Sequence, residues 1–151
     1  MTEKLTKRKK PYHYTESGLN NIWLSGIYED EDGDPVIPNP IQLHKEIAIS
    51  LALLKRRLNG EEIRFLRSHI GLSGADLARK ILKVSPETVS RWENNRQTMD
   101  RSTEILIRIM VLKEIEYNDY EIEDLTDLNN QAKVRLEAKF SPRGKRWNLA
   151  A

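Results

Sequence analysis

Residues 83–96, Lys-Val-Ser-Pro-Glu-Thr-Val-Ser-Arg-Trp-Glu-Asn-Asn-Arg, are the stretch that most constrains how this chain can fold. Ser85 can cap a helix by accepting from backbone N–H groups one turn further on, and Pro86 suits the first helical position. Val89 and Trp92 are three residues apart, so both side chains lie on one helix face and can enter a core. The stretch therefore predicts a short helix with one buried stripe and one exposed polar face.

The exposed face of this predicted helix carries Glu87, Thr88, Ser90 and Arg91. Glu87 and Arg91 are four residues apart, so they can form an ordinary exposed ion pair or be read together by a partner. A helix of this length fits the major groove of DNA, with its N-terminal residues at the base edges. DNA is therefore the leading candidate partner for this face.

Two helices are predicted before this region. Apolar residues recur at three- and four-residue spacing over residues 41–57 and again over residues 61–69. The Asn59-Gly60 pair between them is expected to stop the first helix. The breadth of the apolar stripe over residues 41–57 indicates that this helix packs on more than one side.

Two more helices complete the helical region. Ser73, with Asp76 three residues on, is expected to cap a third helix, which residues 83–85 join to the helix over residues 86–94. Asp100 or Ser102 is expected to cap a fifth helix running to about residue 116. That helix is apolar nearly all round, so one face can close the core and the other needs a partner.

The third and fourth helices carry a resemblance to a known family. Leu72-Ser73, Leu77-Ala78 and above all residues 84–94 resemble the Xre/Cro-type helix-turn-helix domain, and the resemblance covers residues 60–112. It implies that the helix over residues 86–94 reads DNA bases. It also implies that Arg91 suits guanine O6 and N7, and that Glu87 accepts from cytosine N4 or orients Arg91.

The resemblance also implies contacts to the DNA backbone. Ser73, Ser90 and Arg96, together with the helix N-termini, would bind phosphates and so position the protein without specifying sequence. The complete set of expected DNA-binding residues is Ser73, Ser85, Pro86, Glu87, Thr88, Ser90, Arg91, Asn95 and Arg96.

Two residues depart from the family pattern. Gly74 stands where the family often has a Gln that touches the DNA backbone, so one contact is expected to be missing. The segment from residue 78 to residue 84 is one residue longer than usual, and Lys83 replaces the common turn Gly. The turn is therefore expected to be wider than in the family.

The flanking segments predict small β elements. Residues 1–10 form a basic arm that is either a flexible tail or a phosphate contact, and residues 11–40 predict strands with a kink near Gly26 and a turn at residues 30–34. Residues 117–131 are acidic and polar and are expected to form a connector. The alternation from Val134 to Phe140, with a turn at residues 142–144, predicts a C-terminal hairpin.

The hairpin allows two interpretations. It could be a plain surface hairpin, or it could pair with the N-terminal strands in one small sheet, within the chain or across a dimer. The sheet is favoured because Trp23, Phe140 and Trp147 need cover.

The expected fold is therefore mainly α with small β elements, a five-helix Xre/Cro-type helix-turn-helix domain with N-terminal strands and a C-terminal β-hairpin. Its expected segments are a flexible basic arm at 1–10, a β-rich segment at 11–40, a DNA-binding domain at 41–116 and the acidic connector with the hairpin at 117–151.

A second resemblance lies near the N-terminus. Tyr-His-Tyr-Thr-Glu-Ser-Gly-Leu, within residues 11–24, resembles the N-terminal part of MqsA-type antitoxins and related regulators. That family places an extra domain before the Xre-type domain, and it uses the latter to dimerise and bind operators. Its Cys-based zinc site is absent here, and His13, His44 and His69 are isolated, so no metal is expected. His13 is interpreted as a packing or hydrogen-bonding residue rather than a ligand.

Composition excludes several classes of protein. The chain has 151 residues and no cysteine, which excludes disulfides and thiolate metal sites and suits the cytoplasm. The longest apolar run, residues 47–54, is too short to span a bilayer, and no apolar stretch follows the basic start, so neither a membrane span nor a signal peptide is expected. No nucleophile–base pair or phosphate-binding loop is recognisable, so we expect neither an enzyme nor a cofactor.

These observations lead to two functional hypotheses. The first is a homodimeric, sequence-specific transcriptional regulator that binds an inverted repeat in double-stranded DNA, an autoregulating repressor of the antitoxin type. The alternative is a protein-binding antitoxin that neutralises a toxin through its N-terminal strands or through the acidic residues 29–34 and 114–127. The two are compatible.

Overall fold

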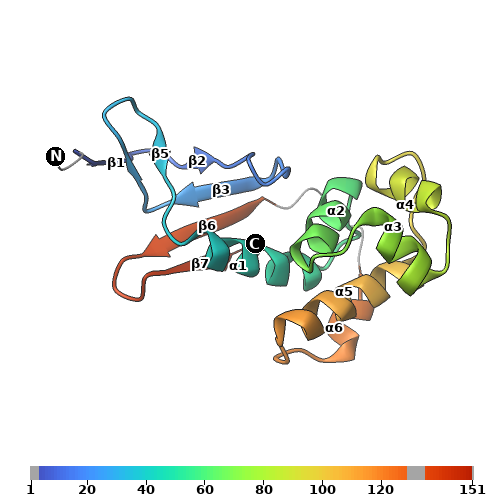
Figure 1. The fold of residues 1–151 in the computed structure, drawn as a ribbon. Coiled ribbons are helices and arrows are strands. Elements are labelled where there is room, and N and C mark those ends of the chain that lie inside the picture. Colours follow the sequence, from blue (N-terminus) through green and yellow to red (C-terminus); the bar gives the residue numbers. More distant parts are fainter. Residues whose placement is uncertain (1–3, 129–134, 151) are drawn as a thin grey trace. The chain divides into compact units, whose positions relative to one another are not determined.

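The structure is a computed structural model that describes residues 4–128 and 135–150. The chain divides into two compact units, which are described separately below (Figure 1). Unit 1 comprises Met1–Ile47 and Lys133–Ala151, and unit 2 comprises Ala48–Ala132. No helix among the described residues is long and apolar enough to cross a membrane.

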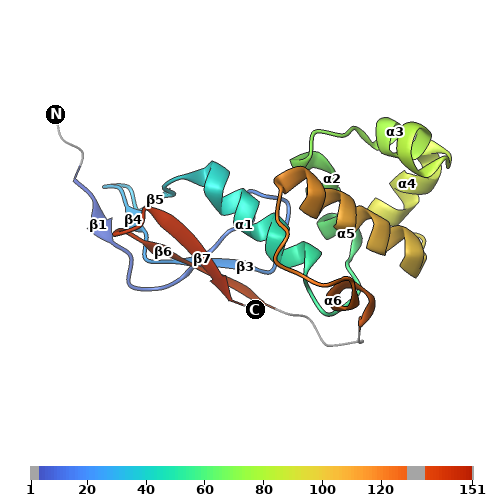
Figure 2. The ribbon, with the colours of Figure 1, turned by 90° about the horizontal axis from the view of Figure 1, so that it is seen from below.

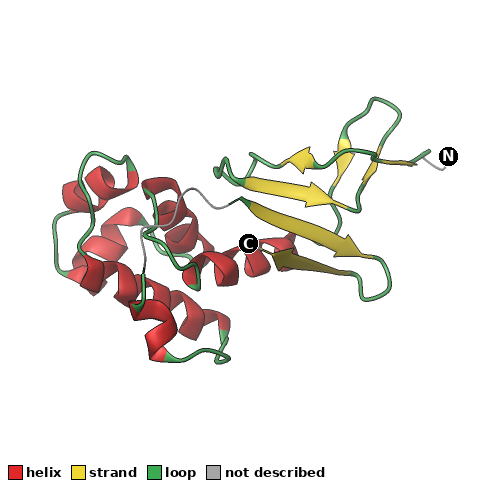
Figure 3. Cartoon of the chain, turned by 180° about the vertical axis from the view of Figure 1, so that it is seen from behind, coloured by secondary structure: helices red, strands yellow, loops and turns green. Residues whose placement is uncertain are grey.

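Unit 1 contains two β-sheets, drawn in yellow in Figure 3. The three-stranded sheet has the order β1-β4-β5, and the four-stranded sheet has the order β2-β3-β6-β7. All neighbouring strands are antiparallel except β3 and β6, which are parallel. The strands are β1 (Thr6–Lys7), β2 (Tyr12–His13), β3 (Ile22–Ser25), β4 (Tyr28–Glu29), β5 (Pro35–Val36), β6 (Leu136–Ser141) and β7 (Arg146–Ala150).

The four-stranded sheet has one buried face and one open face. Ile22 of β3 pairs with Leu136 of β6, and Leu24 pairs with Ala138 two residues on. All four side chains are fully buried, as the two-residue side-chain period requires for one face of a sheet. The first part of α1 (Pro40–Ala52) covers this face (Figure 2), and its Leu43 is fully buried as well.

The kink and the acidic turn expected in the N-terminal segment are both present. Gly26 has a φ of 74°, and a Cβ atom there would lie 2.8 Å from the backbone oxygen of Phe140. Only glycine combines this backbone conformation with so close an approach. The turn at residues 30–34 connects β4 to β5 as an antiparallel hairpin.

The basic arm is not entirely a tail. Thr6 and Lys7 form β1, which pairs with β4, and Arg8 binds Glu29 at 3.2 Å. Residues 1–3 lie outside the described part of the chain.

Unit 2 is helical. Its core residues come from several helices and include Ile63, Leu77, Val89, Trp92 and Ile107, each at most 6% exposed. The elements are the end of α1, α2 (Gly60–His69), α3 (Gly74–Asp76), a π-helical segment η1 (Leu77–Leu82) that continues α3, α4 (Pro86–Glu93), α5 (Arg101–Ile115) and α6 (Ile122–Thr126). Ser73, Ser85 and Asp100 cap α3, α4 and α5 as expected.

The first helix ends earlier than its apolar pattern predicts. It was expected to run to residue 57, but α1 ends at Ala52. The buried guanidinium of Arg108 donates to the carbonyl oxygens of Ala52, Leu54 and Arg56, at 3.2, 2.5 and 2.5 Å. These hydrogen bonds satisfy carbonyl oxygens at and after the end of α1, which have no partner within the helix. The side chain of Arg108, at least 52 residues away in the sequence, therefore sets where the helix ends.

The expected role of Asn59-Gly60 is also wrong. Asn59 does not stop the preceding helix but caps α2, accepting from the backbone N–H of Glu62 at 2.9 Å. The carboxylate of Glu62 accepts in return from the backbone N–H of Asn59 at 2.9 Å, which completes a capping box.

The expected fold class, mainly α with small β elements and a five-helix Xre/Cro-type domain, is contradicted. The described residues form six α-helices, a π-helical segment and sheets of three and four strands, which is a mixture of α and β structure. The prediction failed for two reasons. The first is the parallel pairing of β3 with β6, which joins strands more than 100 residues apart and therefore leaves no local pattern in the sequence. The second is α6, a short helix within the expected acidic connector, which a capping box between Glu121 and Asp124 holds.

The C-terminal hairpin is part of the sheet. β6 and β7 pair over five residues, from Ser141 with Arg146 to Glu137 with Ala150, and β6 adds the hairpin to β3 of the same chain. The interpretation that it joins the N-terminal strands is therefore confirmed, and the plain surface hairpin is wrong. Val134, its expected first residue, lies outside the described residues.

Candidate nucleic-acid interface

Helix α4 has the two faces that its sequence predicts. Ser85 accepts from the backbone N–H of Thr88 at 3.3 Å, and the two hydroxyl groups are 2.9 Å apart. Val89 and Trp92 are buried, with exposed fractions of 1% and 6%. The expected position of Trp92 in the core is confirmed.

The connection before α4 consists of a π-helical segment and a residue in the left-handed conformation. Segment η1 has π-helical hydrogen bonding, in which the backbone N–H of Lys83 donates to the Ala78 carbonyl, and the backbone N–H of Val84 donates to the same oxygen at 3.0 Å. A π-turn accommodates one more residue per turn than the α-helix does. Lys83 ends η1 in the left-handed conformation, with a φ of 56°. It occupies a position that usually favours glycine.

The polar face of α4 is open to solvent. Ser85, Glu87, Ser90 and Arg91 are exposed, whereas Pro86 and Thr88 are half-buried. Arg91 donates to Oε1 of Gln97 at 3.1 Å and to Oγ1 of Thr88 at 3.3 Å. No ion pair among the described residues joins Glu87 to Arg91, so the interpretation of these residues as an ordinary helical ion pair is not supported.

The remaining expected contact residues lie at the two ends of this region. Ser73 is exposed at the start of α3, and its hydroxyl accepts from the backbone N–H of Asp76 at 3.0 Å. Arg96 is exposed in the turn after α4. Gly74 lies beside α4, because a Cβ atom there would be 4.0 Å from Cγ1 of Val89.

Asn95 makes protein contacts that its sequence position does not predict. Its amide oxygen accepts from the backbone N–H of Gly60 at 2.8 Å, and its amide nitrogen donates to both carboxylate oxygens of Glu61 at 3.0 Å. Its φ is 59°, a left-handed conformation that Asn tolerates at the end of a helix. Asn95 thereby ties the end of α4 to the start of α2.

A buried carboxylate fixes the orientation of α4, and sequence reasoning missed it. Glu93 is 5% exposed and accepts from Arg67 in a bidentate pair at 2.6 and 2.9 Å, while Arg64 donates to it at 3.3 Å. The hydrogen bond to Glu93 raises the pKa of Arg67, so this guanidinium stays charged. Glu93 is four residues from Val89 on the same helix face, and this spacing is the signal that could have found it.

The close approach of α2 and α4 also depends on Gly60. A Cβ atom on Gly60 would lie 2.3 Å from the backbone oxygen of Glu93 and 2.6 Å from that of Trp92. The start of α2 and the end of α4 are therefore in direct backbone contact. Glycine is the residue that allows this approach.

A second network of buried charges joins the segment after α1 to α2 and α5. Arg108 is fully buried and binds Glu104 at 2.8 Å, and Arg57 binds the other oxygen of Glu104 at 2.9 Å. Arg56 and Glu62 form a bidentate pair at 2.8 and 2.9 Å. Burial lowers the pKa of Arg108, while Glu104 opposes that shift. These cations are held by the protein and are not offered to a partner.

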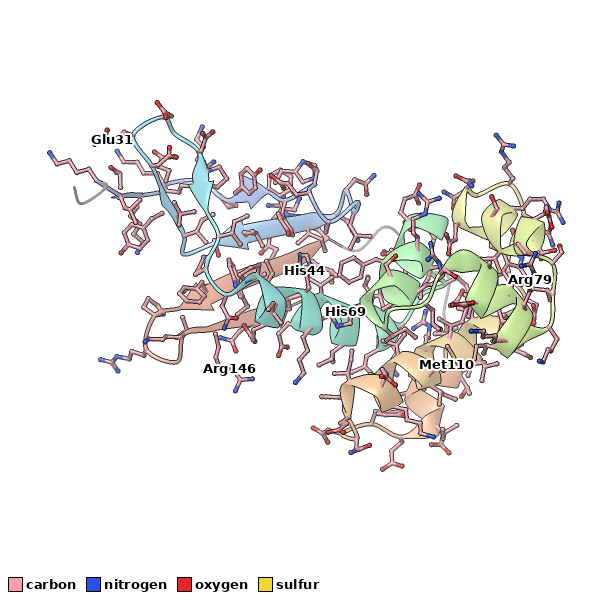
Figure 4. All side chains as sticks on the ribbon, viewed as in Figure 1. Glu31, His44, His69, Arg79, Met110 and Arg146 are labelled. Carbon is pink, nitrogen blue, oxygen red and sulfur yellow. The ribbon has the colours of Figure 1, made fainter. Side chains whose placement is uncertain are left out.

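The surface around α4 is basic. Asp76 binds Lys80 at 3.5 Å, and such an exposed ion pair contributes little free energy. The charge of Glu93 is neutralised by its two arginine partners, so Glu87 is the exposed acidic residue between residues 73 and 97. Arg79 projects from η1 in Figure 4. The exposed basic residues between residues 73 and 97 are Arg79, Lys80, Lys83, Arg91 and Arg96.

The histidine and acidic positions in unit 1 have structural explanations. His13 stacks on Trp23 with ring centroids 4.4 Å apart, and its Nε2 lies 2.7 Å from the Asn20 carbonyl oxygen, which confirms the packing interpretation.

The carboxylates of Asp30, Asp32 and Asp34 lie within 4.8 Å of one another. One Asp30 oxygen accepts from the backbone N–H groups of the other two at 2.9 Å, a turn that accounts for the clustering.

Comparison with known proteins gives no match, either to a protein-family model, to a curated protein or to a solved structure. A functional assignment therefore rests on the residues and geometry described above.

Proposed function

We propose that this protein is a sequence-specific, DNA-binding transcriptional regulator, an autoregulating repressor of the antitoxin type that places α4 in the major groove of double-stranded DNA. The observation that carries the proposal is the contrast between the two faces of α4. Val89, Trp92 and Glu93 are buried and clamped, while the opposite face presents Glu87, Ser90 and Arg91 to solvent. A rigidly held helix with exposed hydrogen-bonding groups suits base readout.

Arg91 is available to a partner in a way that the buried arginines are not. It donates hydrogen bonds to the neutral side-chain oxygens of Gln97 and Thr88, and both bonds are exposed to solvent. Groups on DNA can replace these two acceptors at little cost in free energy. Arg67 and Arg108, by contrast, are bound to buried carboxylates. In the proposal Arg91 donates to guanine O6 and N7, and Glu87 accepts from cytosine N4 or orients Arg91.

The other contact residues have positioning roles. Ser73, Ser85, Ser90 and Arg96, with the N-terminus of α4, would bind phosphates and set the register of the protein on the duplex. Pro86 and Thr88 shape the start of α4 and face the same groove. Asn95 acts through the protein rather than on DNA, because its amide is engaged by Gly60 and Glu61.

The resemblance of residues 84–94 to Xre/Cro-type recognition helices supports the same role and adds a homodimer acting in the cytoplasm. Two copies of α4 would read half-sites about 34–36 Å apart, so the target is an inverted repeat. Binding is expected to weaken steeply with salt, because counterions return to the phosphates.

Footprinting and electrophoretic binding on the DNA upstream of the protein's own reading frame test the proposal. The double variant Glu87→Ala plus Arg91→Ala should lose about 1–3 kcal/mol of specific binding for each base contact removed, and so lose the footprint. The matched control, Lys113→Ala plus Glu123→Ala, removes one charge of each sign from exposed positions away from α4 and should bind as the wild type does. Unchanged specific binding by the α4 variant would overturn the assignment.

The protein-binding antitoxin remains a second candidate, because α6 exposes an apolar residue within a stretch of exposed acidic residues. Ile122 of α6 is 53% exposed, and the charged residues around it are nearly all acidic. Such a surface would complement a basic toxin. The exposed acidic residues are Glu114, Glu116, Asp119, Glu121, Glu123 and Asp127.

Co-expression with any small protein that a neighbouring reading frame encodes tests this candidate. Capture of a basic partner by the wild type but not by Ile122→Asp would support it. Capture that is equal for both, or no capture at all, would remove this surface as the binding site.

A further inference from the structure

We propose that the turn of the β6–β7 hairpin is a second DNA-binding element, which contacts phosphates through Arg143 and Lys145. This inference rests on the proposed function, because it assigns an additional surface for the same ligand. The sequence predicts this hairpin, but the proposed function uses only residues in and next to α3 and α4 and assigns the hairpin no role.

The hairpin concentrates positive charge. Residues 135–149 contain five basic residues and one acidic residue, Glu137. Glu137 binds Arg135 at 3.1 Å, and Arg146 reaches Glu46 only at 3.8 Å with 66% of its own side chain exposed. No ion pair among the described residues involves Arg143 or Lys145, and both are exposed. Their charges are therefore directed to solvent rather than to the protein.

The turn is held by the protein although its side chains are open. The backbone carbonyl of Lys145 accepts from the amide of Asn39 at 3.2 Å. Next to it, Trp147 is 1% exposed, its indole N–H donates to the Pro38 carbonyl at 2.8 Å, and its backbone N–H donates to Gln42 at 2.7 Å. A turn whose backbone is already ordered loses little conformational entropy when a ligand binds.

The two hairpin turns of unit 1 carry opposite charges. The β4–β5 turn carries Asp30, Glu31, Asp32 and Asp34, whereas the β6–β7 turn carries only basic residues. Figure 4 labels Glu31 on the first hairpin and Arg146 on the second, and they project in different directions. The net charge of +2 hides this separation. A surface with one sign of charge binds a polyanion far more strongly than an averaged surface does.

The composition of the turn favours DNA over an acidic protein. Protein interfaces draw most of their affinity from a few fully buried anchors, chiefly Trp, Tyr and Arg. Residues 142–146, Pro-Arg-Gly-Lys-Arg, contain no aromatic residue, and both arginines are exposed. Phosphates need only exposed cations and room to approach, which the small Gly144 supplies.

The test measures how binding of the full chain depends on salt, using a labelled duplex from upstream of its reading frame and a random duplex of the same length. The variant Arg143→Gln plus Lys145→Gln removes two charges and keeps the side-chain length. The matched control Lys55→Gln plus Lys113→Gln removes two charges beside the acidic surface of unit 2. Circular dichroism and thermal unfolding verify that both variants are folded.

Each phosphate contact contributes about −0.9 to the slope of log K against log salt, so the hairpin variant should have a slope less negative by about 1.8. Between about 50 and 200 mM salt, its affinity should then fall about tenfold less than that of the wild type. The change should be equal on the two duplexes, because phosphate contacts carry no sequence information. The control should keep the wild-type slope.

A hairpin variant with the wild-type slope would overturn the inference and leave an acidic protein as the partner of this turn. That result would not touch the proposed function if Glu87→Ala plus Arg91→Ala still abolished specific binding. Conversely, a reduced slope in the hairpin variant together with no effect of the α4 variant would overturn the proposed role of α4 and support the hairpin. Failure of the wild type to bind either duplex would overturn both.

Discussion

Replacement of Gly60 by alanine tests whether the contact between α2 and α4 holds unit 2 together. The added Cβ atom would lie 2.3 Å from the Glu93 oxygen and 2.6 Å from the Trp92 oxygen, and both are backbone atoms that no rotamer change can move. Overpacking costs about 1–3 kcal/mol, and a backbone clash belongs at the upper end, near 3 kcal/mol. Gly60 is the first residue of α2, so alanine recovers there less than the roughly 1 kcal/mol of helix propensity that it gains in a helix interior, and the net destabilisation is at least about 2 kcal/mol.

For a unit of this size, that loss corresponds to a decrease in Tm of roughly 8–16 °C. Thermal and urea unfolding followed by circular dichroism measure it. Gly74→Ala is the matched control, because its Cβ atom would meet Val89 at an ordinary 4.0 Å, and it should be neutral or stabilising by about 0.5 kcal/mol. Equal unfolding midpoints for Gly60→Ala and Gly74→Ala would refute the reasoning.

Three further changes probe the buried charges and one titrating group. Glu93→Gln should destabilise unit 2 by about 3 kcal/mol in urea unfolding, since it leaves Arg67 without its buried partner; a loss below about 0.5 kcal/mol would contradict the clamp. Arg108→Met should cost about 3–5 kcal/mol by the same measurement, because it uncovers three carbonyls and a buried carboxylate, and a variant as stable as wild type would disprove this role. Burial lowers the pKa of His44, which lies 2.6 Å from the Tyr14 hydroxyl, so the folded state binds fewer protons than the unfolded state. Stability should therefore be complete above about pH 6.5 and decrease as the pH falls toward the lowered pKa of the folded state, whereas His44→Gln should lose this dependence; equal pH profiles would rule the effect out.

The local features of the helical region could be predicted because each depends on neighbours in sequence. Ser73, Ser85 and Asp100 satisfy the first N–H groups of the helices that they precede, and a cap needs only the next three residues. The same holds for the two faces of α4, where Val89 and Trp92 are three residues apart. The exposed set Glu87, Ser90 and Arg91 followed from that periodicity.

The errors arose where partners are distant. The apolar pattern of residues 41–57 continues beyond Ala52, but Arg108 of α5 provides the carbonyl contacts that end α1. The expected fold class missed the parallel contact of β3 with β6, which depends on residues from both ends of the chain. Sequence reasoning also missed the contacts of Asn95, whose amide binds the backbone N–H of Gly60 and the carboxylate of Glu61.

The sequence by itself determined the short-range elements of this protein: the capped helix at residues 86–93, its polar face, the hairpin turns and the absence of thiol chemistry. These depend on backbone conformation and on residues within one or two turns. Only the tertiary structure decided that Glu93, Arg67 and Gly60 fix α4 against α2, and that the C-terminal hairpin completes a sheet begun by β2 and β3. The reason is physical, because buried ion pairs, backbone approaches and parallel strand pairing join residues far apart in the chain, and no local periodicity records them.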